Sequence, residues 1–160
     1  MTFSRPLVSL AIVVVVITGA YAWFSQSRNF ADADLEVRNQ DHKTLSVAGV
    51  PLSVLVADTA PSRERGLSGK ESLDPDEGML FVFDAPDTVS FWMKDMLFPI
   101  DIIWIGADMH VVDTTEHLSP STYPSTFSPR APAQYVLEVR EGWVAAHGIA
   151  AGSSVLGITQ

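Results

Sequence analysis

The feature that most constrains this chain is an uncharged run from Leu7 to Phe24. The run is dominated by valine and isoleucine and has no polar face that a helix could turn to water. At about 1.5 Å per residue, a helix of this length rises about 27 Å, close to the hydrocarbon thickness of a bilayer. Residues 1–24 are therefore predicted to enter a membrane, so the fold has to be built from the residues that follow.

Two interpretations of this run remain open. Ala20-Tyr21-Ala22 fits the small-x-small cleavage site of a signal peptide. Trp23 and Phe24 are typical of an interfacial aromatic belt, which favours an uncleaved signal anchor. Arg5 lies in front of the run and predicts that the N-terminus stays inside. We expect a single-pass protein of the cell membrane with its domain on the extracytoplasmic side, or a periplasmic or secreted domain if the leader is cleaved.

Composition excludes several classes of partner for the part of the chain that is predicted to be exported. The chain has no cysteine, which excludes disulfides and thiolate metal sites. Of its ten basic residues Arg5 precedes the membrane run, whereas all nineteen acidic residues follow it. The remaining net charge of −10 makes nucleic acid and anionic lipid headgroups poor partners. The membrane, contacted through the N-terminal helix, is the expected partner besides a ligand.

Turn-forming and helix-capping residues, together with the periodicity of the hydrophobic residues, divide the rest into a polar linker, residues 25–42, and one compact domain, residues 43–160. The domain is predicted to be mainly β with α+β character, with about eight strands and two short helices. The helices are expected at Thr59–Gly66, which has a capping threonine and an early proline, and at Gly142–Gly148. The strands are expected within Lys43–Asp58 (two, with a turn at Ala48-Gly49), Met79–Phe83, Thr88–Lys94, Ile100–Ile105, Met109–Thr114, Ala133–Arg140 and Ser154–Ile158.

Two connections have a distinctive composition. Asp84-Ala-Pro-Asp87 is a turn sequence between two predicted strands. Glu116 to Ala133 contains four prolines, and a loop of this length in a small domain is usually functional or disordered. Tyr123 in this loop is a candidate pocket lid or sugar platform, although a loop tyrosine more often anchors its own loop.

The stretch FWMKDMLFPIDIIWI, residues 91–105, places charges inside the most hydrophobic part of the domain. As a strand it has aromatic side chains on both faces, which predicts that both faces are covered. Lys94 would then need a partner, and Asp101 could face it across Pro99. Either the two form a structural ion pair, or Lys94 binds a polar or anionic group over the Trp92 ring; Asp95 belongs to the same candidate site.

The two arginines of the first predicted helix are a further candidate. Arg63 and Arg65 point about 200° apart on a helix, so only one of them turns inward easily. Arg65 either complements the carbonyls at the helix end or forms a planar fork for a carboxylate or phosphate.

No cofactor or metal is expected. Four methionines with His110 and His117 could in principle hold Cu(I), but Met79 and Met93 lie in apolar strands, where methionine is ordinarily core filler. Nucleophilic catalysis lacks support because the chain has neither cysteine nor a Gly-x-Ser-x-Gly motif.

A series of motifs resembles the family called domain of unknown function 192, small and often exported bacterial and archaeal proteins without a secure activity. The resemblance covers about residues 44–158 and implies a single small domain. The matching pieces are Ala57-Asp58-Thr59 with Arg63, Arg65-Gly66-Leu67, Glu77–Phe83, Phe91-Trp92-Met93-Lys94, Pro99-Ile100-Asp101, Pro132-Ala133, Tyr135–Glu138, Gly142-Trp143 and Gly148. Two departures stand out: Asp95-Met96 replaces the usual Asn-Thr, and Ser68 replaces a common Met.

The leading hypothesis is therefore a membrane-tethered extracytoplasmic module that binds a small polar or anionic ligand, such as a saccharide or envelope component. Its predicted contact residues are Arg65, Trp92, Lys94, Asp95, Asp101 and Tyr123. Two alternatives remain: an envelope hydrolase with Asp95 and Asp101 as acid and base, and an assembly partner for another membrane protein. The sequence favours a binding protein over an enzyme.

Overall fold

The computed structural model describes residues 42–158. The predicted membrane segment, Leu7–Phe24, and nearly all of the predicted linker lie outside the described residues. Within residues 42–158, no helix combines the length and the hydrophobicity needed to cross a membrane.

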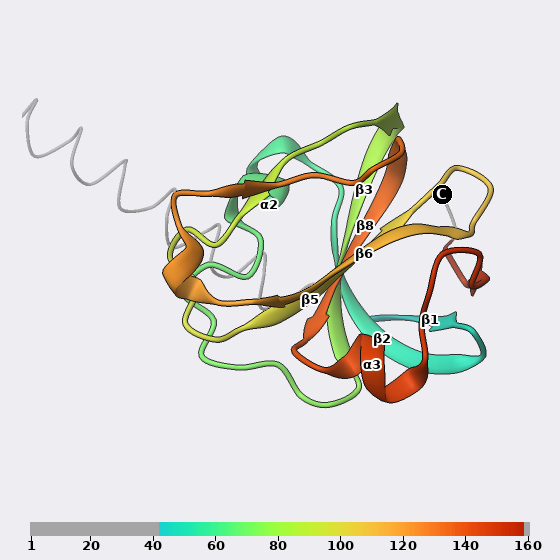
Figure 1. Cartoon of the computed structure of the whole chain (residues 1–160), viewed down its shortest axis with the longest axis horizontal. Coiled ribbons are helices and arrows are strands. Elements are labelled where there is room, and N and C mark those ends of the chain that lie inside the picture. Colours follow the sequence, from blue (N-terminus) through green and yellow to red (C-terminus); the bar gives the residue numbers. More distant parts are fainter. Residues whose placement is uncertain (1–41, 159–160) are drawn as a thin grey trace, which may run out of the picture. The chain divides into compact units, whose positions relative to one another are not determined.

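Nine strands and two short helices make up the described domain, which confirms the mainly β fold class (Figure 1). Seven strands form one sheet in the order β6-β5-β8-β3-β2-β1-β9. They are β1 (Lys43–Val47), β2 (Val50–Ala57), β3 (Glu77–Asp87), β5 (Ile100–Ile105), β6 (Val111–Leu118), β8 (Ala133–Arg140) and β9 (Val155–Leu156). The other two, β4 (Phe91–Trp92) and β7 (Thr126–Phe127), form a separate ribbon. The helices are α2 (Ala60–Arg65) and α3 (Trp143–His147), with a 3₁₀ turn, η1, at Pro120–Thr122.

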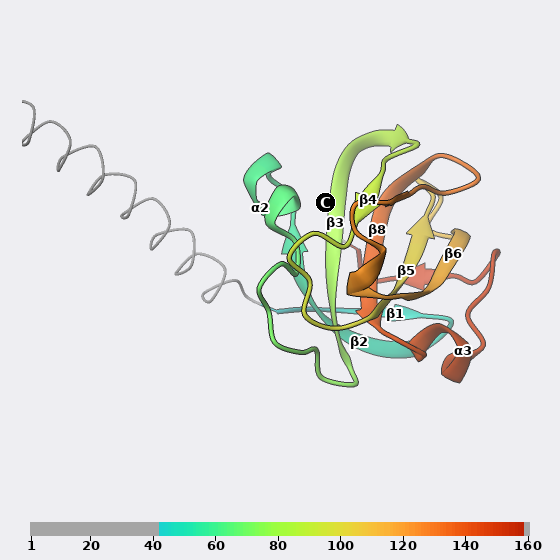
Figure 2. The same cartoon turned by 60° about the vertical axis from the view of Figure 1, so that its left-hand side comes forward.

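A parallel pair determines where α2 lies. β2 and β3 run parallel, whereas the other neighbouring strands are antiparallel. Parallel neighbours need a crossover connection, and here α2 and the following loop provide it. Leu67 and Leu73 of that loop are buried on one face of the sheet. Figures 1 and 2 show α2 and α3 well apart in the domain.

Both faces of the sheet are covered, and β8 shows this most clearly. Tyr135, Leu137 and Val139 belong to one buried cluster, together with residues of β1, β9 and α3. Val136 belongs to the other, with residues of the α2 loop and of the segment after β4. Side chains alternate between faces along a strand, so Glu138 lies on the face of Val136. The site described below lies on that face.

The structure corrects two predictions around β4. The predicted strand Thr88–Lys94 is reduced to Phe91–Trp92, and it pairs with β7 rather than joining the large sheet. Trp92 is therefore 49 % exposed instead of covered. Asp95 adopts a positive φ of 56°, a conformation that ends extended structure.

The predicted turn Asp84–Asp87 is also wrong, because β3 continues through it to Asp87. A register shift between Val82 and Asp87 lets Asp87 pair with Ala133 of β8. The residues from Asp84 to Asp87 are exposed, so this end of the strand tolerates residue types that are usual in turns.

Candidate functional site

Glu138 is a buried acid without a partner for one of its oxygens. It lies in the middle of β8, opposite Met79 of β3 and Ile102 of β5, and is 5 % exposed. Its Oε2 atom has no hydrogen-bond partner among the described residues. Burial away from water raises the pKa of Glu138 to about 8, so most of the carboxyl population at neutral pH holds its proton.

The other two buried acids of the described residues have partners. Asp113 accepts hydrogen bonds from the Arg130 side chain and from the Arg130 and Thr114 amides, and the Arg130 hydrogen bond chiefly lowers its pKa. Asp101 accepts hydrogen bonds from two backbone amides. Since buried polar groups are generally paired, the unpaired oxygen of Glu138 calls for an explanation.

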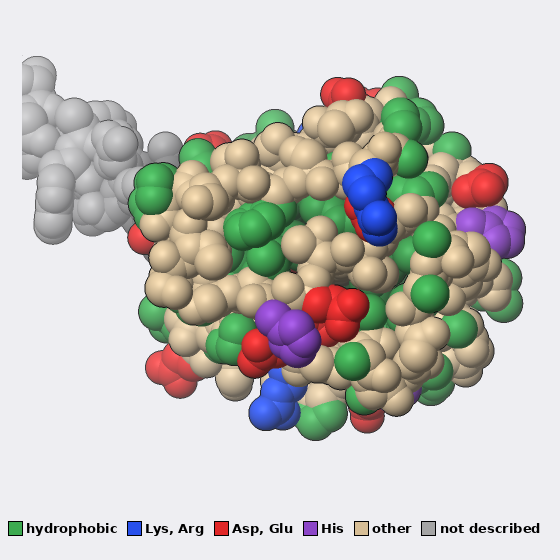
Figure 3. Space-filling view, in the orientation of Figure 1, with side chains coloured by type: hydrophobic (Ala, Val, Ile, Leu, Met, Phe, Trp, Pro, Cys, Tyr) green, Lys and Arg blue, Asp and Glu red, His purple; other side chains and the backbone are tan. Residues whose placement is uncertain are grey.

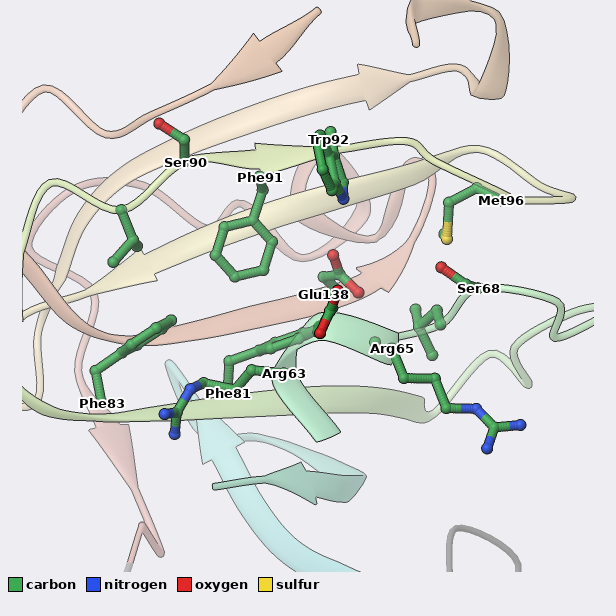
Figure 4. A pocket seen from close by; sticks show the side chains of 14 residues that line it. Arg63, Arg65, Ser68, Phe81, Phe83, Ser90, Phe91, Trp92, Met96 and Glu138 are labelled. Carbon is green, nitrogen blue, oxygen red and sulfur yellow. The ribbon is translucent and has the colours of Figure 1, made fainter. Parts of the chain in front are cut away.

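A cavity opens in front of this carboxyl. It has a volume of about 350 Å³ and is bounded by the end of α2, the loop after it, β3, β4 and β8. Figure 4 shows the Glu138 carboxyl pointing into the space between Trp92 on one side and Ser68 and Met96 on another. Glu138 is thus the polar floor of an otherwise largely apolar space.

Aromatic rings form one wall of the cavity. Phe81, Phe83, Phe91 and Trp92 line it. Phe91 packs edge-on against Phe81 at 4.9 Å and against Trp104 at 5.5 Å between ring centroids, which fixes its ring from two sides. The pairing of β4 with β7 leaves Phe91 partly buried in the cavity wall and Trp92 exposed at the edge of the same cavity.

Helix α2 borders the cavity. Thr59 caps the helix by accepting a hydrogen bond from the Ser62 amide, and Gly66 ends it with a φ of 50°. A Cβ at Gly66 would approach the Phe81 ring to 3.3 Å, so glycine also allows the close packing of the helix end on β3. Arg63, Glu64 and Arg65 of α2 line the cavity.

Neither arginine is directed at Glu138. Arg63 donates hydrogen bonds to the carbonyls of Asp58 and Val82 and lies over the Phe83 ring, so it ties the helix to β3 and to the residue that follows β2. The Arg65 guanidinium points away from the Glu138 carboxyl in Figure 4.

Of the six predicted contact residues, Arg65 and Trp92 line the cavity. Tyr123 and Lys94 do not line it but contact Trp92 from outside. The Tyr123 ring lies 6.1 Å from the Trp92 ring, edge-on, and the Lys94 ammonium lies 5.8 Å from that ring. Tyr123, Trp92 and Lys94 therefore form an exposed rim, called here the Trp92 rim.

Lys94 and Asp101 do not form the ion pair that the sequence suggested. Lys94 is exposed, whereas Asp101 is fully buried and accepts hydrogen bonds from the amides of His117 and Val144. The two side chains diverge because the chain turns after β4 instead of continuing as a buried strand. Asp95 is exposed as well and does not share a cleft with Asp101.

Two hydrogen bonds to backbone carbonyls connect the loop that carries Ser68 with the segment that carries Lys94. The Ser68 hydroxyl donates to the Lys94 carbonyl at 2.9 Å, and the Gly69 amide donates to the Asp95 carbonyl at 2.9 Å. Ser68 and Met96 both line the cavity. The two departures from the family pattern thus meet beside Glu138.

We expect Lys94→Met to leave the melting temperature within about 2 °C of the wild-type value. The lost contact is one exposed cation–π interaction, which contributes roughly 0.5 kcal/mol. Thermal unfolding followed by circular dichroism measures this, with Lys43→Met as a control at another exposed lysine. A loss of many degrees specific to Lys94→Met would mean that Lys94 supports the core.

Sequence reasoning missed Glu138 as a site residue, although a signal was present. Glu138 is the charged residue in the apolar run Tyr135–Val139, which was predicted to be a strand. Met79 and Met93 are buried in the core, and within residues 42–158 no group of three or more His, Asp or Glu side chains is placed to hold an ion.

The face shown in Figure 3 carries Lys and Arg side chains that are separated from one another. Among the described residues on that face, the basic side chains do not gather into a patch. That face therefore offers no broad cationic surface.

Comparisons with known proteins relate this chain to solved structures and to one protein family. The chain is similar to a crystal structure of a proposed transcription regulator from Sinorhizobium meliloti, at 30% identity and a TM-score of 0.68, over 72% of this chain and 93% of the other. It is also similar to a protein of unknown function from Novosphingobium aromaticivorans, at 28% identity and a TM-score of 0.68, over 72% and 84% of the two chains. No curated protein matches. The family DUF192, described as an uncharacterised group, matches residues 43–157, most of the domain. The chain belongs to the DUF192 family, as its motifs predicted.

Proposed function

We propose that this domain binds a small ligand in the cavity between α2 and β4, with Glu138 as the polar contact at its floor. The observation that carries the proposal is the unpartnered, buried oxygen of Glu138 facing an aromatic-walled cavity. A volume of about 350 Å³ lies within the range of ligand pockets, which are typically mostly apolar with a few placed polar groups. The ligand would carry a polar group on an apolar or stacking body.

This site favours a neutral polar or cationic group over the anionic group that the sequence also suggested. Arg63 is engaged by backbone carbonyls and by Phe83, and the Arg65 guanidinium points away from the floor of the cavity. A carboxyl group at the floor would repel an anion whenever it is charged. A saccharide remains a fitting class, because Trp92 and Tyr123 offer ring surfaces at the rim.

The two alternative functions have less support. A paired-carboxylate hydrolase needs two acids across one cleft, whereas Asp101 is buried away from Asp95 in hydrogen bonds to backbone amides. An assembly partner would use the exposed Trp92, Leu97 and Tyr123, but these side chains are equally suited to a ligand rim. We therefore place the function in the cavity.

The ligand-binding domain is proposed to work outside the cytoplasm, tethered by Leu7–Phe24. A reporter that is active only outside the cytoplasm, fused after the domain, is expected to be active, and the chain should fractionate with membranes. A soluble mature chain that begins near Trp23 would contradict the tether but not the export.

Ligand capture should depend on Trp92. Screening small polar compounds by thermal shift against the full-length chain in detergent is expected to find compounds that raise the melting temperature. Trp92→Ala should weaken their binding by about tenfold or more, because it removes a wall of the cavity. Leu156→Ala is the control, since Leu156 is an exposed apolar residue outside the cavity. Compounds that bind wild type and Trp92→Ala equally would contradict this site.

A further inference from the structure

We propose that the ligand of the Glu138 cavity is a small organic cation, an amine on an apolar body, whose ammonium N–H groups pair with the Glu138 carboxylate. This inference rests on the proposed small-ligand function and specifies its ligand class. Buried polar atoms are normally hydrogen-bonded. Oε2 of Glu138 is a buried acceptor that lacks a donor among the described residues.

The ionisable groups of the surrounding elements do not supply that donor. Strands β3 and β5 place Met79 and Ile102 beside Glu138 in register. Helix α2 contributes Arg63, which is held by backbone carbonyls, an exposed Glu64, and Arg65, which points away. The segment after β4 contributes Lys94 and Asp95, both exposed and outside the cavity lining. A ligand can therefore bring the missing positive charge.

The aromatic walls of the cavity also favour a cation. Aromatic ring faces attract cations, because the ring quadrupole is negative there. Two rings of this cavity already have a protein cation nearby: the Arg63 guanidinium lies 5.2 Å from the Phe83 centroid, and the Lys94 ammonium lies 5.8 Å from the Trp92 centroid. Phe81 and Phe91 continue the same wall toward Glu138.

An ammonium with N–H groups fits better than a neutral alcohol. It satisfies the free oxygen by a charge-assisted hydrogen bond, which is about twice as strong as a neutral one. It also compensates the charge that burial otherwise disfavours. The domain is acidic overall, so long-range electrostatics attracts a cation to the mouth as well.

Amine binding is then linked to loss of the Glu138 proton. The pKa of Glu138 is about 8, so the charged form is scarce at pH 6 and reaches about half near pH 8. An alkylamine stays protonated over this range, as a lysine side chain does with its pKa of about 10.4. The affinity for an amine should therefore increase with pH, whereas an uncharged alcohol should bind no better at pH 8 than at pH 6.

Calorimetric titration of the full-length chain in detergent tests this with three matched probes: 2-phenylethylamine, 2-phenylethanol and 3-phenylpropanoate. We expect the dissociation constant for the amine to fall by roughly 50-fold between pH 6 and pH 8, and the amine to bind more tightly than the other two at pH 8. Glu138→Gln should remove the pH dependence and most of the amine affinity. Glu116→Gln, at an exposed position on β6 outside the cavity lining, should change neither.

The outcomes separate this inference from the proposed function. Tighter binding of the alcohol or the carboxylate, lost in Trp92→Ala, would overturn the cation and leave the small-ligand cavity standing. Amine binding without pH dependence in the wild type would also overturn it, and this measurement does not require Glu138→Gln to fold. Probes that all fail to bind, or bind equally to wild type and Trp92→Ala, would overturn both the cation and the cavity function.

Discussion

The free energy of unfolding of this domain is expected to fall as the pH rises from about 5 to about 8, and Glu138→Gln should remove most of that fall. The carboxyl has a pKa of about 8 in the folded chain, against an ordinary value of 4.5. Between these values the folded state keeps a proton that the unfolded state has lost, so raising the pH favours unfolding. The contribution is present below about pH 4.5, is lost progressively up to about pH 8, and is constant above it. Its size is on the order of 5 kcal/mol.

Urea unfolding at pH 5, 6.5 and 8.5, followed by tryptophan fluorescence, measures this effect. Other titrating groups change wild type and Glu138→Gln alike, so the difference between the two profiles isolates Glu138. Glu64→Gln makes the same chemical change at an exposed position and should follow the wild-type profile. Parallel profiles for wild type and Glu138→Gln would show that water or a neighbouring group solvates the carboxyl in the folded domain.

Local signals account for the parts of the fold that the sequence predicts well. Strand β8 has the predicted bounds, Ala133–Arg140, because a strand covered on both faces is mostly apolar, and here Glu138 is the one charged residue between Tyr135 and Val139. Helix α2 lies where Thr59 and Gly66 predicted it, since capping residues act on their own helix. The predicted turn at Ala48-Gly49 is confirmed, and both residues have positive φ values.

The site required information that no local pattern carries. Phe91–Trp92 pairs with Thr126–Phe127, a contact between distant segments that determines which of the two aromatic residues faces water. Glu138 becomes a cavity floor only because α2 and β4 bound the space above its strand without filling it. A period of two places Glu138 on a face of the sheet, but the cover over that face comes from the tertiary arrangement.

Asp101 was also beyond the reach of local sequence patterns. The sequence predicts a ligand contact at this residue, whereas in the structure its carboxylate is buried and holds parts of the fold together. Helix α3 begins after Gly142, which offers no side chain to cap it. The early amides of a helix need acceptors, and one Asp101 oxygen accepts from the Val144 amide at 3.2 Å. The other oxygen accepts at 2.9 Å from the amide of His117, whose φ of 59° is unusual for a side-chain-bearing residue. A buried carboxylate on β5 thus fixes both α3 and an irregular point of β6.

Asp101→Asn is accordingly expected to lower the free energy of unfolding by roughly 2 to 4 kcal/mol. The amide keeps one acceptor oxygen but turns an NH₂ group toward a backbone N–H, so one buried donor loses its partner and a charge-assisted hydrogen bond is lost. Urea unfolding measures the loss, and hydrogen exchange should accelerate at the Val144 and His117 amides before other core amides. Asp95→Asn is the matched control in the same segment, and it should change stability by less than about 0.5 kcal/mol because Asp95 is exposed. If the two variants lost equal stability, or if Asp101→Asn abolished ligand binding while its stability stayed at the wild-type level, Asp101 would act at a binding site rather than as the anchor of α3.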